Sequence, residues 1–108
     1  DLKQSTRQRF VALEFNYPST DTEQMIVEKE SNIDSDMAKQ LVKFGRMTRN
    51  LKGSGLDEGA STRLLVNAGK LMQQDINPVT ATDTAIAQTL TDDADMLKAI
   101  HELSRSIF

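Results

Sequence analysis

Two short segments of this chain place arginine where it could contact a phosphate group. Residues 59–63, with the sequence GASTR, put Arg63 in the first turn of an expected helix. A helix start presents free backbone N–H groups and the positive end of the helix dipole, and a guanidinium adds donors that suit phosphate oxygens. In the second segment, Arg7 and Arg9 stand just before an apolar run. Both segments therefore suggest phosphate binding.

Neither segment is specific when taken alone. The arginines at positions 7 and 9 also fit a solvated basic turn, and an exposed first-turn arginine is usually neutral for function. A cation at that place is mildly unfavourable for the helix dipole, by roughly 0.3–1 kcal/mol. The pattern G-x-x-x-x-G-K-[ST] of a phosphate-binding loop does not occur in the sequence. The chain therefore carries at most one half of a phosphate site.

A third basic group follows one expected helix, where Lys43, Arg46, Arg49 and Lys52 recur every third residue. This stripe could face nucleic acid or an acidic partner, but it also fits the solvated face of an amphipathic helix. The aromatic residue within it, Phe44, falls on the opposite face of the helix, so the stripe carries no stacking platform for bases. The net charge of −3 and the pI near 5.1 argue against a general binder of polyanions. A nucleic-acid-binding helical module is the second hypothesis for function, and a protein-interaction module is the third.

Other kinds of site find little support in the composition. The single histidine, His101, rules out a multi-histidine metal site and a defensible Ser-His-Asp set, and we expect it to be exposed or locally hydrogen bonded. The chain has no cysteine, and its acidic runs lack the ligand spacing of a calcium loop. We therefore predict no metal site. No apolar run approaches the ~20 residues of a membrane span, so we expect a cytoplasmic protein.

The elements that must position these residues are mostly helical. At 108 residues the chain fits one small domain. Residues 10–17 alternate as one strand that ends at Pro18, and everything after this proline is typical of helix. The predicted fold is therefore mostly α, a small bundle of four to five helices preceded by one orphan β-strand. Dimerisation through that strand is the basis of the third hypothesis.

Capping signals divide the helical region. We expect a first helix opened by a capping box at Thr20–Glu23 and ending near Glu30. A second should begin at Asp34 or Ser35 and end at the glycines of residues 53–55. The remaining three should begin at Ser61 or Thr62, at Asn77-Pro78 and at residues 91–93. The expected inward stripes of the second to fifth helices are, in order, Met37, Leu41, Phe44, Thr48 and Leu51; Leu64, Leu65, Ala68, Leu71 and Met72; Thr82, Ala85, Ile86 and Leu90; and Met96, Ile100, Leu103 and Ile107.

Three segments resemble the CbbQ/NorQ/NirQ family of MoxR-type AAA+ ATPases, namely STRQRFVA at residues 5–12, LDEGASTRLL at 56–65 and LTDD at 90–93. The middle segment is the most specific. The resemblance covers nearly the whole chain but only the C-terminal part of such a protein. It implies that residues 1–18 end an α/β nucleotide-binding core, with the arginine-finger loop and the last strand, and that residues 19–108 form its helical lid. Because the chain does not begin with methionine, we expect a piece of a longer protein.

The resemblance implies a role for three arginines. Arg9 lies where the family places its arginine finger, which reaches the γ-phosphate held by the neighbouring subunit of a hexameric ring. Arg63 lies where the family places its sensor-2 arginine, on the lid that closes over the nucleotide, and Arg7 is expected to assist. ATP and Mg²⁺ are the implied cofactors of the full-length protein. The chain alone lacks the phosphate loop, so we expect it to bind neither and to be inactive as an ATPase.

The resemblance also implies partners. In the family, the ring acts with a von Willebrand A-domain protein and couples ATP hydrolysis to post-translational activation of a client enzyme. The clients are Rubisco, which is freed of inhibitory sugar phosphates, and nitric oxide reductase, which is matured with its metal during denitrification. The residues of this chain do not select between these two clients. By this resemblance no nucleic acid is expected as a partner.

Overall fold

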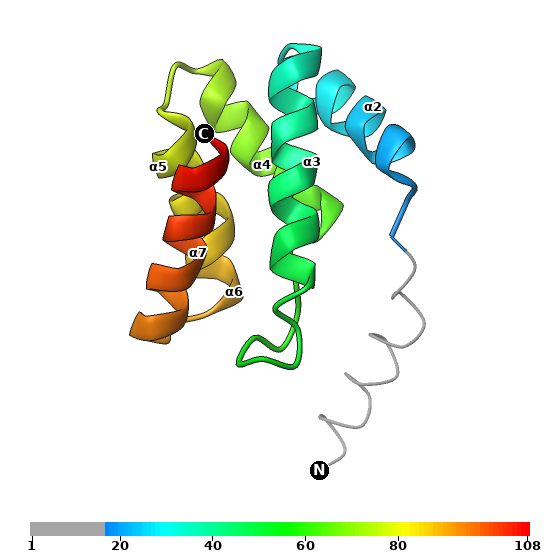
Figure 1. The fold of residues 1–108 in the computed structure, drawn as a ribbon. Coiled ribbons are helices and arrows are strands. Elements are labelled where there is room, and N and C mark those ends of the chain that lie inside the picture. Colours follow the sequence, from blue (N-terminus) through cyan, green and yellow to red (C-terminus); the bar gives the residue numbers. More distant parts are fainter. Residues whose placement is uncertain (1–16) are drawn as a thin grey trace, which may run out of the picture.

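The computed structural model describes residues 17–108, and within this part of the chain every regular element is helical (Figure 1). The elements are α2 (Thr20–Ser31), α3 (Ser35–Arg49), α4 (Thr62–Gln73), α5 (Pro78–Thr82), the π-helical η1 (Asp83–Ala87), α6 (Gln88–Leu90) and α7 (Ala94–Ile107). Since α5, η1 and α6 follow one another without a break, the described part holds five helices, which confirms the predicted small bundle. The predicted strand at residues 10–17 lies outside the described residues, apart from Tyr17, which is not in a strand.

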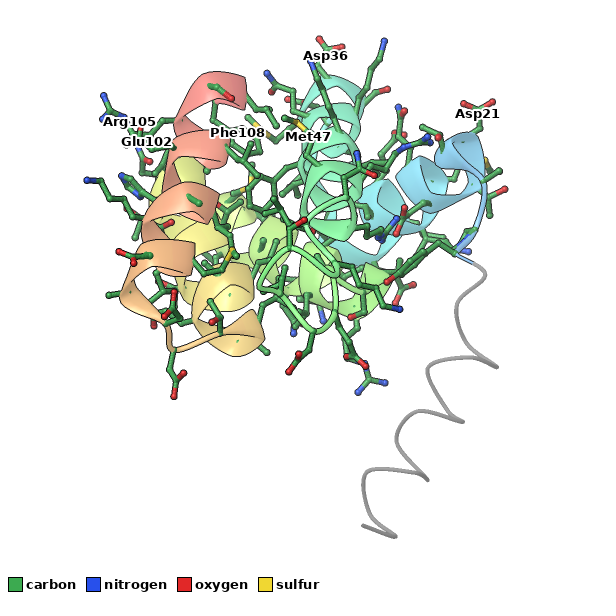
Figure 2. All side chains as sticks on the ribbon, turned by 60° about the horizontal axis from the view of Figure 1, so that its bottom comes forward. Asp21, Asp36, Met47, Glu102, Arg105 and Phe108 are labelled. Atoms are coloured by element: carbon green, nitrogen blue, oxygen red, sulfur yellow. The ribbon has the colours of Figure 1, made fainter. Side chains whose placement is uncertain are left out.

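The helices α3 and α4 form the middle of the bundle, with α2 on one side and the segment from α5 to α7 on the other (Figure 1). The core is aliphatic with one buried ring, and its largest fully buried apolar side chains are Phe44, Leu41, Leu65, Ile86, Ile100, Val27 and Val42. Each such side chain contributes roughly 1.5–3 kcal/mol by leaving water. Phe108, which Figure 2 shows between α7 and α3, extends this core, because its ring centroid lies 6.3 Å from that of Phe44.

Most of the predicted helix starts are confirmed. Asp34, Ser61, Asn77 and Asp93 are the N-caps of α3, α4, α5 and α7, and each side chain accepts a hydrogen bond from a backbone N–H of the first turn. Pro78 occupies the first turn of α5, as expected. An N-cap of this kind contributes about 1 kcal/mol. Local capping chemistry therefore sets where these helices begin.

The predicted capping box at the start of α2 is wrong. The N-cap is Ser19, whose Oγ accepts from the backbone N–H of Thr22 at 3.2 Å. Glu23 is 1% exposed and turns into the bundle instead of reaching back to the helix start. The helix continues to Ser31, where Asn32 ends it with a left-handed φ of 59°, a conformation that asparagine tolerates.

The helix α3, in contrast, ends earlier than predicted. Its last residue is Arg49, so Leu51 lies beyond the helix and packs against the core from the following loop. Gly53 and Gly55 have φ of 88° and 111°, which explains why glycine stands at both positions. Leu56 is 2% exposed and anchors the loop to the core. This loop brings the chain back along α3 to the start of α4.

The far side of the bundle carries the π-helical turn. Thr82 and Ile86 are buried, as the predicted stripe required, and the Thr82 and Ser104 hydroxyls lie 2.6 Å apart. His101 is neither fully exposed nor bonded locally, because its Nδ1 lies 2.7 Å from Oδ2 of Asp83 in η1. Of the two expected alternatives, exposure holds in part, because 40% of the side chain is exposed, whereas the hydrogen-bond partner is not local and comes from a different helix.

Candidate functional site

Arg63 lies in the first turn of α4 and its side chain is exposed. Among residues 17–108 no hydrogen bond or ion pair of this side chain is found, and the first turn of α4 contains no acidic residue. The hydroxyl oxygen of the N-cap Ser61 accepts a hydrogen bond from the backbone N–H of Leu64 at 3.3 Å. The guanidinium therefore projects from a positive helix end and is available to an anion.

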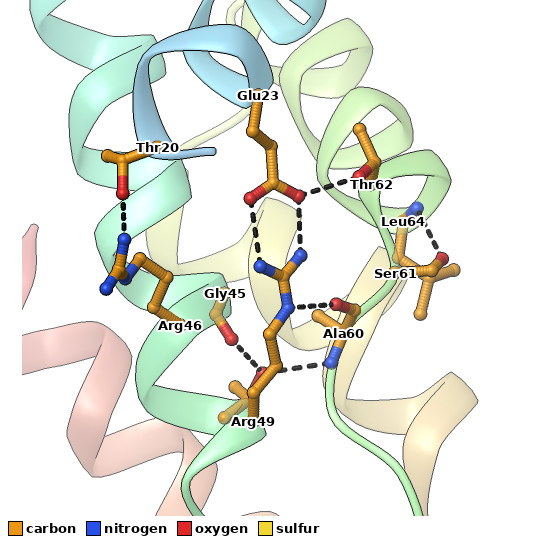
Figure 3. Close-up of polar contacts among 10 residues, drawn as sticks. Thr20, Glu23, Gly45, Arg46, Arg49, Ala60, Ser61, Thr62 and Leu64 are labelled. Atoms are coloured by element: carbon orange, nitrogen blue, oxygen red, sulfur yellow. Dashed lines mark hydrogen bonds and ion pairs between the residues drawn. The ribbon is translucent and has the colours of Figure 1, made fainter. Parts of the chain in front are cut away.

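A buried carboxylate binds the turn that carries Arg63. The Thr62 hydroxyl donates to Oε2 of Glu23 at 2.7 Å (Figure 3). Glu23 comes from the first turn of α2 and is fully enclosed, so this bond joins α2 to the start of α4. A hydrogen bond to a charged group contributes about 1.5–3 kcal/mol, more than a neutral one.

Arg49, the last residue of α3, completes this arrangement. Its Nη1 and Nη2 donate to Oε1 and Oε2 of Glu23 at 2.9 and 2.5 Å, and its Nε donates to the carbonyl of Ala60 at 2.8 Å (Figure 3). The Arg49 side chain is only 11% exposed. A planar guanidinium is suited to this geometry, because its fork matches both carboxylate oxygens while Nε remains free for a third acceptor.

The residues just before α4 fit closely against α3. The Thr48 hydroxyl accepts from the backbone N–H of Ala60 at 3.0 Å and donates to the carbonyl of Gly45 at 2.6 Å. A Cβ at position 59 would stand 2.4 Å from Cα of Arg49, so only glycine fits there. Both backbone groups of Ala60 are therefore bonded to α3.

Each residue of the GASTR segment thus has a separate task in the structure. Gly59 permits the close approach, and Ala60 is buried with its backbone bonded. Ser61 caps the helix and Thr62 binds Glu23. Ser61 and Arg63 are both exposed, but the Ser61 hydroxyl is engaged in the cap, whereas no partner of the Arg63 side chain is found among residues 17–108. The first four residues build a rigid platform for the fifth.

The interpretation of the basic stripe as a solvated face holds for Lys43, Arg46 and Lys52, which are exposed, and is wrong for Arg49. Arg49 is taken up by Glu23 and Ala60, as described above, and Arg46 donates to the Thr20 hydroxyl. Lys52 lies beyond the end of α3, and Lys43 is exposed. The stripe therefore loses Arg49 as a contact for nucleic acid.

Sequence reasoning missed Glu23 and Arg49 as partners. They are separated by 26 residues, and no local spacing rule relates two positions on different helices. Arg7 and Arg9 lie outside the described residues, so the structure does not relate them to Arg63. Between residues 17 and 108 no cluster of three His, Cys, Asp or Glu side chains could hold a metal ion, and no helix there is long and apolar enough to cross a membrane.

Comparison with known proteins identifies relatives over the whole site. The chain is 46% identical over 108 residues to protein CbbQ of Hydrogenophilus thermoluteolus. The aligned residues make up 100% of this chain and 40% of the relative. It is 44% identical over 107 residues to protein NorQ of Paracoccus denitrificans (99% and 40%), and 39% identical over 102 residues to the denitrification regulatory protein NirQ of Stutzerimonas stutzeri (94% and 37%). The chain thus spans about two fifths of the length of these relatives.

A family model supports the same relationship. The model described as CbbQ/NirQ/NorQ C-terminal matches residues 23–107, from the buried glutamate of α2 to the end of α7. Glu23, Arg49 and the platform of Arg63 all fall inside this match. The resemblance inferred from three short segments is therefore confirmed along the chain, and the chain belongs to the CbbQ/NirQ/NorQ C-terminal family.

Proposed function

We propose that this chain is the helical lid of a ring-forming AAA+ ATPase of the MoxR type, and that Arg63 is its nucleotide-sensing arginine. The observation that carries the proposal is a contrast between neighbouring residues. Arg63 is exposed and without a partner among residues 17–108, while Ala60 and Thr62 just before it are held by buried and partly buried hydrogen bonds to α3 and α2. A fixed platform with one free cation is what binding of a phosphate group requires. Family membership supports the same role.

In this proposal, Arg63 binds the γ-phosphate of ATP held by the nucleotide-binding core of the full-length protein. Phosphoryl transfer depends mainly on positioning and on neutralising charge, so a guanidinium on a positive helix end suits it. When hydrolysis releases the γ-phosphate, Arg63 loses its partner and the preferred lid angle changes. Because Ala60 is bonded to α3 and Thr62 to α2, we expect the lid to move as one body with Arg63.

Arg9 is proposed as the arginine finger that acts on the nucleotide of the neighbouring subunit, with Arg7 beside it. Both are carried over from the family pattern around QRF and lie outside the described residues. Mg²⁺ accompanies ATP in this proposal, but residues 17–108 offer no cluster to hold it.

The proposed role of the whole ring is activation of a client enzyme, together with a von Willebrand A-domain partner. One relative is named a denitrification regulatory protein, which supports a role in denitrification. Nitric oxide reductase and Rubisco, the two proposed client classes, are carried over from the family resemblance. A hexameric cytoplasmic assembly completes the proposal.

The test of the sensor is nucleotide affinity in the full-length protein. Arg63→Ala should weaken ATP binding by roughly 10- to 200-fold, the loss expected when a charge-assisted hydrogen bond to an anion disappears. Lys70→Ala is the matched control, because Lys70 is an exposed cation at the other end of α4. Equal ATP affinity in the Arg63 variant and in the control would overturn the assignment.

The finger is tested separately by hydrolysis. Arg9→Ala should lower ring ATPase turnover by about 10³- to 10⁵-fold, which is the usual contribution of an arginine finger, while ATP binding stays near the wild-type level. Mixing the variant with subunits that carry intact Arg9 but cannot bind ATP should restore part of the turnover, because the finger acts across the subunit interface. Normal hydrolysis by Arg9→Ala alone would refute the finger.

A further inference from the structure

We infer that Arg49 is a positioning residue that couples the entry to the lid, at Tyr17, to the platform of Arg63. This inference rests on the proposed function for its consequence, but its structural basis is independent of it. Arg49 touches Tyr17 on one side, and Glu23 and Ala60 on the others. It is thus the side chain that contacts both the chain entering the lid and the segment leading to Arg63.

The contact with Tyr17 is a stack of a cation on an aromatic ring. The guanidinium carbon of Arg49 lies 3.7 Å from the ring centroid, within the range of a favourable cation–π interaction. Tyr17 stands two residues before Ser19, the N-cap of α2, so it is the point at which the chain enters the helical bundle. A shift of the chain at this point changes the surroundings of Arg49 directly.

The contact with Tyr17 can open without disrupting the core. The Tyr17 ring is 40% exposed, and it borders a hollow of about 300 Å³ that Pro18, Arg46 and Asn50 also line. The ring therefore has room to move away from Arg49. The hydrogen bonds that the same guanidinium donates to Glu23 and Ala60 are partly buried. The Arg49 side chain thus has one partly exposed contact, with Tyr17, and several hydrogen bonds that are shielded from solvent.

Stability alone is a weak reason for this arrangement. A buried ion pair gains little over well-packed apolar residues of the same size, because the loss of hydration offsets the attraction. What the pair supplies is a fixed geometry: two bonds orient the guanidinium plane, and the third then fixes the Ala60 carbonyl. Three residues further on comes Arg63. An angular change of the Arg49 plane is therefore transmitted to the first turn of α4.

The decisive variant is Arg49→Lys in the full-length protein. Lysine keeps the charge opposite Glu23 but cannot make the paired bonds and the bond to Ala60 at the same time. We expect faster amide hydrogen exchange at Ala60 and Leu64, with exchange at the buried Ile100 of α7 unchanged. ATP affinity should fall by roughly 2- to 30-fold, the usual range for residues that act through another. Arg46→Lys, an exposed neighbour on α3, is the matched control and should change neither quantity.

The Tyr17 contact is tested by a pair of substitutions. Tyr17→Leu removes the aromatic face, and it should reproduce a smaller part of both effects. Tyr17→Phe keeps the ring and should behave like wild type, since only the face of the ring meets Arg49. If Tyr17→Leu leaves both amide exchange and ATP affinity unchanged, the coupling to the chain entry is refuted.

A double substitution separates failure of this inference from failure of the proposed function. If Arg49 acts through Arg63, then Arg49→Lys should weaken ATP binding no further in a protein that already carries Arg63→Ala. Fully additive losses would overturn the inference, as would unchanged exchange at Ala60 and Leu64. If Arg63→Ala alone has no effect on ATP affinity, the proposed function fails and so does the nucleotide part of this inference. The exchange result then still decides whether Arg49 holds the turn.

Discussion

Arg49 and Arg63 are the same residue type, lie 14 positions apart and belong to adjoining helices, yet their surroundings differ completely. Arg49 is 11% exposed and bonded to a carboxylate and a carbonyl. Arg63 is exposed, and among residues 17–108 no bond of its side chain is found. Charge within a fold is therefore no guide to function by itself. In our proposal, the arginine without a partner among these residues binds the ligand, and the paired arginine fixes the position of the turn that carries it.

The largest loss of stability should come from removing the carboxylate of the ion pair between Glu23 and Arg49. Glu23→Ala leaves Arg49 without its carboxylate and the Thr62 hydroxyl without its acceptor. We expect the free energy of unfolding to fall by about 3–5 kcal/mol, as for other buried pairs that lose one member. Glu30→Ala on the exposed side of α2 is the control and should change it by less than about 0.5 kcal/mol. Denaturant unfolding measures the free energy of unfolding of both variants. Equal losses in Glu23→Ala and Glu30→Ala would show that the pair of Glu23 and Arg49 does not stabilise the fold.

A smaller loss is expected when the platform is pushed away from α3. Gly59→Ala places a Cβ 2.4 Å from Cα of Arg49, and neither backbone can yield easily. We expect a loss of about 3 kcal/mol, the upper end for overpacking. Gly53→Ala is the comparison: its Cβ meets open space, and only the left-handed φ of 88° opposes it, by roughly 1 kcal/mol. A Gly59 variant as stable as the Gly53 variant would contradict the close approach seen here.

Next in size is the helix cap beneath Arg63. Ser61→Ala removes the acceptor for the backbone N–H of Leu64 and should lower the free energy of unfolding by about 1 kcal/mol. Ser61→Asp should retain most of the stability, because aspartate is an equally good N-cap and its charge suits the helix start. Thermal unfolding distinguishes the two variants. Equal destabilisation by alanine and aspartate would show that Ser61 does not stabilise α4 by capping it.

The smallest effect on stability should come from Arg63 itself. Arg63→Ala removes a cation from the positive end of α4 and breaks no bond among the described residues. The free energy of unfolding should therefore stay constant or rise, by roughly 0.3–1 kcal/mol. Thermal unfolding of the chain without nucleotide is the measurement. A loss of more than about 1 kcal/mol would place Arg63 with Arg49 among the structural arginines.

Local signals in the sequence predicted the helices well. Ser61, Asn77 with Pro78, Asp34 and Asp93 are capping residues whose side chains bond within their own first turn, so their neighbours in sequence suffice to identify them. The buried stripe of α3 at Leu41, Phe44 and Thr48 follows from helical periodicity in the same way. What depends on adjacent residues was therefore predictable.

The platform beneath Arg63 was not predictable in this way. Glu23 has the spacing of a capping residue and Arg49 the spacing of a solvated stripe, and both interpretations failed because each side chain bonds to a partner 26 residues away. The π-helical turn at Asp83–Ala87 escaped prediction for a related reason, since its inward residues fit an ordinary helix equally well. Arg63 itself was identified from its segment, whereas the reason for its fixed position came only from the packing of three helices.

The central claim is that Arg63 serves a nucleotide and not the fold. The most direct measurement is the rise in unfolding temperature that ATP causes in the full-length protein, compared between wild type, Arg63→Ala and Lys70→Ala. Bound ligand stabilises by mass action, by about 2.7 kcal/mol at 100 times its Kd. Without ATP we predict that Arg63→Ala unfolds at the wild-type temperature or slightly above it, and that the ATP-induced rise, measured for each protein against its own value without ATP, is strongly reduced only in Arg63→Ala. An equal rise in all three proteins would contradict the account.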